Sequence, residues 1–135
     1  MDFLDTNIIL RYLTKDDPRK AERCFDLFQS VKRKDLRLVT SESVMAEVVY
    51  VLSSKSLYNQ SRQNVRALLL PIVSLPGLKI PHRRTFLRAL DLYGATRLDF
   101  EDALSIAHME RQKIHTILSY DEDFDEVKDI QRREP

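Results

Sequence analysis

The chain has 135 residues, of which 43% are hydrophobic, and 22 lysines and arginines against 21 aspartates and glutamates leave a net charge of +1. This length predicts a single domain over residues 1–135, and the lone Cys24 excludes an internal disulfide. Because the net charge is nearly zero, the chain as a whole does not attract nucleic acid, and only a local cluster of basic residues could do so. We expect a cytoplasmic protein, because no basic-then-apolar leader opens the chain and no apolar run approaches the roughly 20 residues of a membrane span.

Glycine is scarce, since Gly77 and Gly94 are the only two. Their isolation excludes a glycine-rich phosphate loop and a dinucleotide-binding fingerprint. Any phosphate chemistry therefore needs another device, and a metal ion held by carboxylates is the obvious one.

The first half of the chain alternates short apolar strands with amphipathic helices. Thr6 or Asn7 is expected to cap the first helix, and Pro18 suits the first turn of the second. Ser41 is expected to start the third helix. In chain order the pattern predicts a strand over 2–5, helices over 6–13 and 18–31, a strand over 36–40 and a helix over 41–52.

The second half repeats this alternation. Pro76-Gly77 predicts a turn between a helix and a short strand that ends at Pro81. The Thr116–Ser119 strand is expected to be buried. In order the pattern predicts a helix over 61–75, a strand over 78–80, helices over 84–94 and 100–112, a strand over 116–119, a turn at 123–124 and a weak strand over 127–131. Alternating strands and helices predict an α/β protein with a mainly parallel central sheet.

Four acidic residues fall where such a fold carries its chemistry. Asp5 ends the first strand, and Asp121 follows the Thr116–Ser119 strand, which places both at carboxyl ends of strands. Glu47 lies in the third helix among apolar neighbours, and Asp102 opens the sixth helix. The alternative for the aspartates is simple helix capping. The alternative for Glu47 is an ion pair with one of the arginines Arg62, Arg66 and Arg97.

Taken together, the acids indicate a cation. Several carboxylates that converge at one end of a sheet repel one another unless a metal ion neutralises them. Ligands that are all oxygen, without clustered cysteine or histidine, favour Mg²⁺ or Mn²⁺ over Zn²⁺.

Four segments of the sequence resemble the PIN-domain family. The opening Phe3-Leu4-Asp5-Thr6-Asn7 is similar to that family's first motif, and Ser43–Val48, Leu98–Ala107 and Ile117–Phe124 are similar to its second, third and fourth acidic segments. The residues from Ile130 to the end resemble the family's closing strand. The match covers essentially the whole chain, with its motifs in the expected order.

This resemblance implies a three-layer α/β/α sandwich and a ribonuclease that depends on Mg²⁺ or Mn²⁺. It implies that Asp5, Glu47, Asp102 and Asp121 are the catalytic and metal-binding acids. A compact member of the family looks most like the VapC-type toxins of toxin–antitoxin pairs. That likeness implies an RNA substrate, an antitoxin partner and a homodimer.

Several neighbours of the four acids have open roles. Asp99 either caps the sixth helix or joins the metal ligands, and Asp123 is expected to cap the turn at Phe124. Thr6 and Ser119 either support the acids by orienting a carboxylate or water, or form turns and caps.

Other chemistries fit the sequence less well. A haloacid-dehalogenase-type phosphotransferase needs a second aspartate where this chain has Asn7, and a receiver domain needs an aspartate where it has Thr40-Ser41. The three histidines have no zinc-ligand spacing, and neither glycine makes a serine-hydrolase elbow. The remaining alternative is a non-catalytic RNA-binding or scaffold module with the same fold.

Two surface features concern partners. Clusters of lysine and arginine, such as Lys32-Arg33-Lys34 with Arg37, either are solvated faces or hold the RNA backbone. The helical stretch 41–75 carries more apolar residues than one buried face needs, Tyr50 and Leu57 among them. Part of it is expected to form a dimer interface or an antitoxin groove, the alternative being a wholly internal helical pair.

Overall fold

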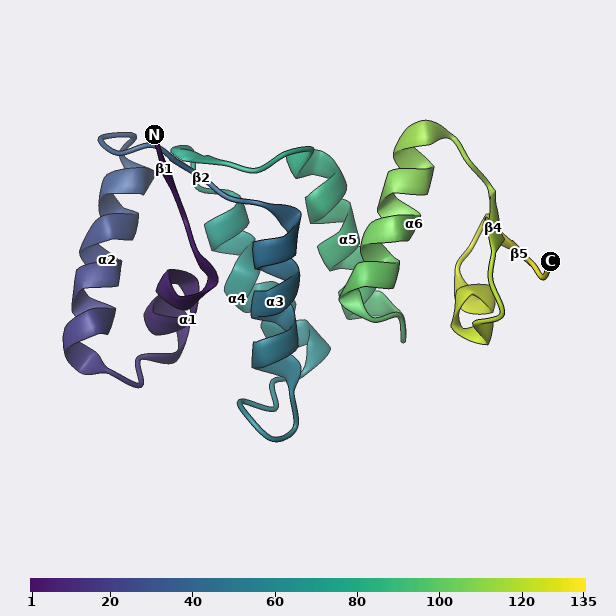
Figure 1. Cartoon of the computed structure of the whole chain (residues 1–135), viewed down its shortest axis with the longest axis horizontal. Helices are drawn as coiled ribbons and strands as arrows, with labels where there is room; N and C mark the ends of the chain where they lie inside the picture. Colours follow the sequence, from purple (N-terminus) through teal and green to yellow (C-terminus); the bar gives the residue numbers. More distant parts are fainter. The chain divides into compact units, whose positions relative to one another are not determined.

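The computed structural model describes residues 1–135, which divide into two compact units. Unit 1 comprises Met1–Arg83 and unit 2 comprises Arg84–Pro135. Each unit contains helices and parallel strands (Figure 1). None of the helices combines the length and the apolar character that crossing a membrane requires.

Unit 1 is built on a three-stranded parallel sheet in the order β1-β2-β3. The register aligns Asp2 with Leu38 and Leu38 with Leu78. Its elements are β1 (Asp2–Phe3), α1 (Thr6–Thr14), α2 (Pro18–Lys32), β2 (Leu38–Val39), α3 (Glu42–Ser53), α4 (Arg62–Val73) and β3 (Leu78–Lys79). The core of the unit consists of aliphatic side chains from the helices, with Ile9, Val31, Met45, Val48, Val65 and Leu69 fully buried.

Local signals explain where the unit 1 helices begin. The Asp17 side chain accepts a hydrogen bond from the backbone N–H of Lys20 at 3.1 Å, and Pro18 occupies the first turn, where its missing N–H costs nothing. Ser41 caps α3 as predicted, by accepting from the N–H of Val44 at 3.2 Å. The predicted cap of α1 was wrong: Asp5 occupies the N-cap position, and neither Thr6 nor Asn7 does.

Unit 2 contains two long helices and a two-stranded parallel sheet. Its elements are α5 (Arg83–Ala95), which begins at the boundary, α6 (Phe100–Gln112), β4 (Thr116–Leu118), the short 3-10 helix η1 (Glu122–Glu126) and β5 (Gln131–Arg133). Strands β4 and β5 pair in parallel, with Thr116 opposite Gln131. The rings of Phe86 and Phe100 lie 5.2 Å apart and join α5 to α6.

The predicted α/β class with parallel strands is confirmed, and all six predicted helices are present. Two details of the C-terminal region were wrong. The last strand is Gln131–Arg133 rather than 127–131, because Val127 closes the 3-10 helix through its N–H to Phe124 and Asp129 has a left-handed backbone (φ 66°) that extended strands do not adopt. Strand β4 is also not buried, since Leu118 is 58% exposed.

Candidate active site

Asp5 lies at the carboxyl end of β1 and directly precedes α1. It has the extended backbone of a helix N-cap, yet its side chain makes no capping hydrogen bond. The Asp5 carboxylate therefore does not cap α1 through a hydrogen bond. Asp5 is an exposed residue.

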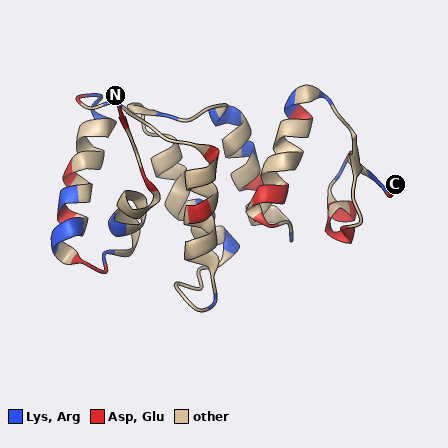
Figure 2. Cartoon of the chain, viewed as in Figure 1, with Lys and Arg blue, Asp and Glu red and all other residues tan.

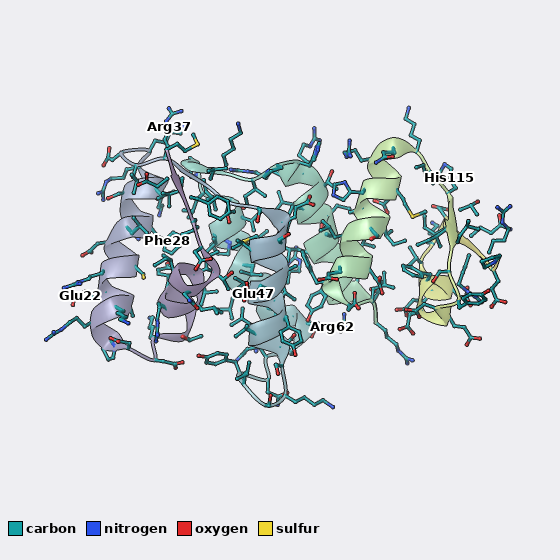
Figure 3. All side chains as sticks on the ribbon, viewed as in Figure 1. Glu22, Phe28, Arg37, Glu47, Arg62 and His115 are labelled. Atoms are coloured by element: carbon teal, nitrogen blue, oxygen red, sulfur yellow. The ribbon has the colours of Figure 1, made fainter.

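Thr6 and Glu47 are joined although 41 residues separate them. The buried hydroxyl Oγ1 of Thr6 donates a hydrogen bond to Oε2 of Glu47 at 2.9 Å. Glu47 is labelled on α3 in Figure 3. Glu47, which the sequence places among apolar neighbours, is not buried with them: α3 buries the stripe formed by Val44, Met45, Val48, Val49 and Leu52, and Glu47 is exposed. Thr6 thus contacts the carboxylate of Glu47 directly, and its supporting role in the site stays a prediction.

Unit 2 holds the other two predicted acids and gathers further carboxylates beside them. Asp99 caps α6, because its Oδ1 accepts from the backbone N–H of Asp102 at 2.8 Å. Burial, together with the charges of Asp99 and Asp121, raises the pKa of Asp102 from 3.8 to about 6. Figure 2 shows the acidic colouring on the first turn of α6 and on η1. These carboxylates repel one another, as the sequence led us to expect of converging acids.

Asp121 caps the short helix η1. Its Oδ1 accepts from the N–H of Asp123 at 2.9 Å, so the cap of this turn is Asp121 and not Asp123 as predicted. The hydroxyl of Ser119 accepts from the N–H of Asp121 at 3.0 Å. Ser119 therefore shapes the turn that carries Asp121, which is the turn-forming role considered for it.

Sequence reasoning missed Arg132, which braces the same turn. Its guanidinium donates to the Ser119 carbonyl at 3.2 Å and pairs with Asp125 and Glu134, each at 2.9 Å. The side chain of Arg132 is only 14% exposed, although it lies in a short polar strand. The detectable signal was the alternation in β5, which places Arg132 on the opposite face from Gln131 and Arg133.

The predicted residues thus fall into two sets, Asp5, Thr6 and Glu47 in unit 1 and Asp99, Asp102, Ser119 and Asp121 in unit 2. Neither unit contains a group of three or more His, Cys, Asp or Glu side chains that lie close enough together to hold a metal ion. The donor chemistry still fits a hard divalent cation, since the candidate ligands are carboxylates. The pKa of Asp102 is raised first by burial and then by the charges of Asp99 and Asp121, and a bound cation would offset both effects.

Comparison with known proteins identifies the family. The model of the PIN domain matches residues 3–130, a span that includes all four predicted acids. None of the curated proteins matches the chain. Among solved structures, VapC20 of Mycobacterium tuberculosis, described as a toxin that cleaves the sarcin–ricin loop, is 19% identical with a TM-score of 0.41, over 93% of each chain. The family match covers nearly the whole sequence, and the chain therefore belongs to the PIN-domain family.

Proposed function

We propose that this protein is a metal-dependent endoribonuclease and that Asp5, Glu47, Asp102 and Asp121 are its essential acids. The observation that carries the proposal is the PIN-domain match over residues 3–130, in which these four acids occupy the motifs that resemble the family's acidic segments. The proposal treats units 1 and 2 as parts of one nuclease domain.

The metal ion of the proposal is Mg²⁺ or Mn²⁺. The four acids would hold it, and Asp99 is a further candidate ligand. When bound, such an ion supplies positive charge that activates water and offsets the charge of the phosphodiester. The protein supplies the geometry: Thr6 fixes the orientation of Glu47, while Ser119 and Arg132 fix the turn that carries Asp121.

The acidic motifs contain no histidine, so the proposal excludes the histidine-based attack by a ribose 2′-hydroxyl. Attack by water on phosphorus, with departure of the ribose 3′-oxygen of the upstream fragment, leaves the phosphate on the 5′ end of the downstream fragment. Product chemistry therefore distinguishes this mechanism from that of metal-independent ribonucleases.

A cleavage assay tests the proposal directly. RNA cleavage should require Mg²⁺ or Mn²⁺, stop in excess EDTA and yield 5′-phosphate ends. Asp5→Asn removes a charge while keeping the side-chain shape, and it should lower the rate by roughly two orders of magnitude or more without changing the melting temperature by more than a few degrees.

Asp2→Asn is the matched control, because Asp2 is an exposed aspartate of the same segment. This variant should cleave like the wild type. Cleavage that persists in EDTA, or 2′,3′-cyclic phosphate products, would overturn the mechanism. RNA binding without any cleavage would instead favour the non-catalytic module.

The finer assignment is to a toxin of the VapC type, with an antitoxin partner, a homodimeric state and a cytoplasmic location. It is supported by the resemblance of the four acidic segments to those of the family. Induced expression in bacteria should arrest growth for the wild type and Asp2→Asn, and should not do so for Asp5→Asn. Equal growth of all three strains at equal protein level would contradict the toxin assignment.

A further inference from the structure

A positively charged pocket in unit 1 is lined mostly by residues that precede or begin the strands of the sheet. It has a volume of about 270 Å³, and Arg37, Lys79 and Arg83 are among the residues that line it. Arg37 directly precedes β2, Lys79 ends β3, and Arg83 follows shortly afterwards in the chain. Figure 3 labels Arg37 near the start of the chain, away from Glu47 on α3. The pocket is separate from Asp5, which lies at the carboxyl end of the same sheet.

Gly77 allows the backbone around this pocket to close up. A Cβ atom at Gly77 would lie 2.5 Å from the carbonyl oxygen of Val31 and 2.7 Å from that of Leu36. The N–H of Gly77 donates to Val31 at 3.1 Å, and its carbonyl accepts from Leu38 at 2.9 Å. The turn after α2 therefore lies directly against the start of β3, which brings Arg37 to the same pocket as Lys79.

The charges of the pocket are not balanced by its own lining, which contains no aspartate or glutamate. Arg83 is held by a hydrogen bond from Nη1 to the Leu75 carbonyl at 3.3 Å, and Arg37 and Lys79 are exposed. The nearby carboxylate of Asp35 is already paired with Arg33 at 2.9 Å. Three cations that share a small pocket repel one another, and a bound anion with several oxygens relieves that repulsion.

We propose that this pocket binds a backbone phosphate of the RNA, at a position distinct from the bond that is cut. The inference rests on the proposed ribonuclease function and extends it with a second contact point for the substrate. Arginine and lysine bind phosphate through charge-assisted hydrogen bonds, and their contacts position a strand without reading its sequence. Because the protein's net charge is only +1, electrostatic attraction of RNA depends on local clusters of basic residues such as this one.

The position of the pocket fits this role. The backbone N–H of Asp2 donates to the Arg37 carbonyl at 3.4 Å, and Asp5 follows Asp2 three positions later along the chain, an extended span of about 10 Å. An RNA strand that reaches Asp5 therefore needs only a few more nucleotides to reach the pocket. The pocket contributes to affinity and to the preferred length of the substrate, while the chemical step depends on the acids.

The test measures RNA binding apart from cleavage. Fluorescence anisotropy with a short, labelled single-stranded RNA is carried out in EDTA on the Asp5→Asn protein, which keeps the probe intact. Arg37→Gln, Lys79→Gln and Arg83→Gln are added together. Binding should weaken by roughly tenfold or more, and the slope of log affinity against log salt should fall by about 0.7 for each phosphate that the variant no longer binds.

The matched control changes three exposed cations of α2 in the same background, Arg19→Gln, Lys20→Gln and Arg23→Gln. It removes the same net charge and should leave affinity and salt slope nearly unchanged. An equal loss in both triple variants would show that only total charge matters and would overturn the inference. Arg83 also donates a hydrogen bond to a backbone carbonyl, so its replacement could affect folding. Lys79→Gln alone is therefore a second variant, and it should weaken RNA binding severalfold without changing the melting temperature. Unchanged RNA affinity in this variant would also count against the pocket.

A second arm separates RNA from free phosphate. Thermal unfolding is measured in inorganic phosphate and in chloride at equal ionic strength, for the wild type and the pocket triple variant. If phosphate stabilises only the wild type while RNA affinity is the same in both proteins, the pocket binds a free anion and the RNA assignment is wrong.

Failure of the proposed function would be recognised separately. If the wild type never cleaves RNA but its RNA binding depends on the pocket, the ribonuclease proposal is wrong and the pocket proposal stands. If the wild type cleaves RNA but its RNA binding is unchanged in the pocket variants, the ribonuclease proposal stands and the pocket proposal is wrong.

Discussion

Asp102 shows how the surroundings of one residue set its chemistry. Its pKa is raised to about 6 by burial and by the charges of Asp99 and Asp121. A raised carboxyl pKa means that ionisation is harder in the folded protein than in the unfolded one. Stability is therefore lost as the pH rises from about 4 to about 6, and the loss is complete above that range.

Replacing Asp102 with asparagine removes this penalty. In EDTA at pH 8, Asp102→Asn should be more stable than the wild type by about 1 kcal/mol, once solvent screening is allowed for, and the two proteins should be equal near pH 3.5. Urea unfolding across this pH range measures the difference. The exposed Asp26→Asn of α2 is the control and should follow the wild type at every pH. A wild type that gains stability between pH 4 and 6 relative to Asp102→Asn would contradict the account.

The hydroxyl of Thr6 is a second test at the residue scale. Thr6→Val keeps the side-chain shape and removes the donor to Glu47, so stability should change by less than about 1 kcal/mol. The cleavage rate at saturating RNA should fall by roughly tenfold, with KM little changed, because Glu47 loses its fixed orientation.

Thr14→Val is the matched control for Thr6, since the Thr14 hydroxyl bonds only a carbonyl of its own helix, that of Leu10, at 2.8 Å. This variant should retain the wild-type rate. Equal rates for Thr6→Val and Thr14→Val would remove Thr6 from the catalytic apparatus.

At the scale of elements, Gly77 determines how closely α2 and β3 approach. Gly77→Ala would force the new Cβ against two backbone carbonyls, those of Val31 and Leu36, and neither can rotate away as a side chain does. We expect a loss of about 2 kcal/mol or more in the free energy of unfolding, measured by urea denaturation. Pro76→Ala, at the exposed neighbouring position, should cost less than about 1 kcal/mol. A Gly77→Ala protein as stable as Pro76→Ala would show that the turn after α2 is free to shift.

At the scale of the whole molecule, the exposed apolar residues indicate which surface would meet a partner. Several apolar residues of the stretch 41–75 prove to be core, among them Val48, Val49, Leu52 and Leu69, which are buried. Tyr50 at 71% and Leu57 at 57% remain exposed. These two are the large apolar side chains of the stretch that are exposed, and they are the ones on which a test of the predicted dimer can act.

The dimer prediction can be tested with one substitution. If Tyr50 lies at the interface, Tyr50→Glu should convert a dimer to a monomer in light scattering at matched concentration, because burial of a carboxylate in an apolar contact is costly. Tyr120→Glu, at a tyrosine that is 70% exposed in unit 2, should remain dimeric. A wild type that is monomeric at high concentration would end the prediction.

Much of the fold followed from local sequence alone. The helices were predicted to within a few residues because their signals are short in range: Pro18 in a first turn, the caps Ser41 and Asp99, and apolar residues at helical spacing. The four acidic segments were predicted from their place at strand and helix ends and from the resemblance to the PIN-domain family, and the role of their acids stays a prediction. A helix forms its hydrogen bonds within four residues, so the sequence nearby contains most of the information that determines it.

The tertiary structure decided what depends on distant residues. The bond from Thr6 to Glu47 spans 41 positions, and the pKa of Asp102 depends on Asp121 across a strand and a turn. The shift of the last strand to Gln131–Arg133, the bracing by Arg132 and the pocket of Arg37, Lys79 and Arg83 likewise depend on which segments pack together. Sequence spacing does not contain these distances, because strand pairing and side-chain contacts arise only when remote parts of the chain meet.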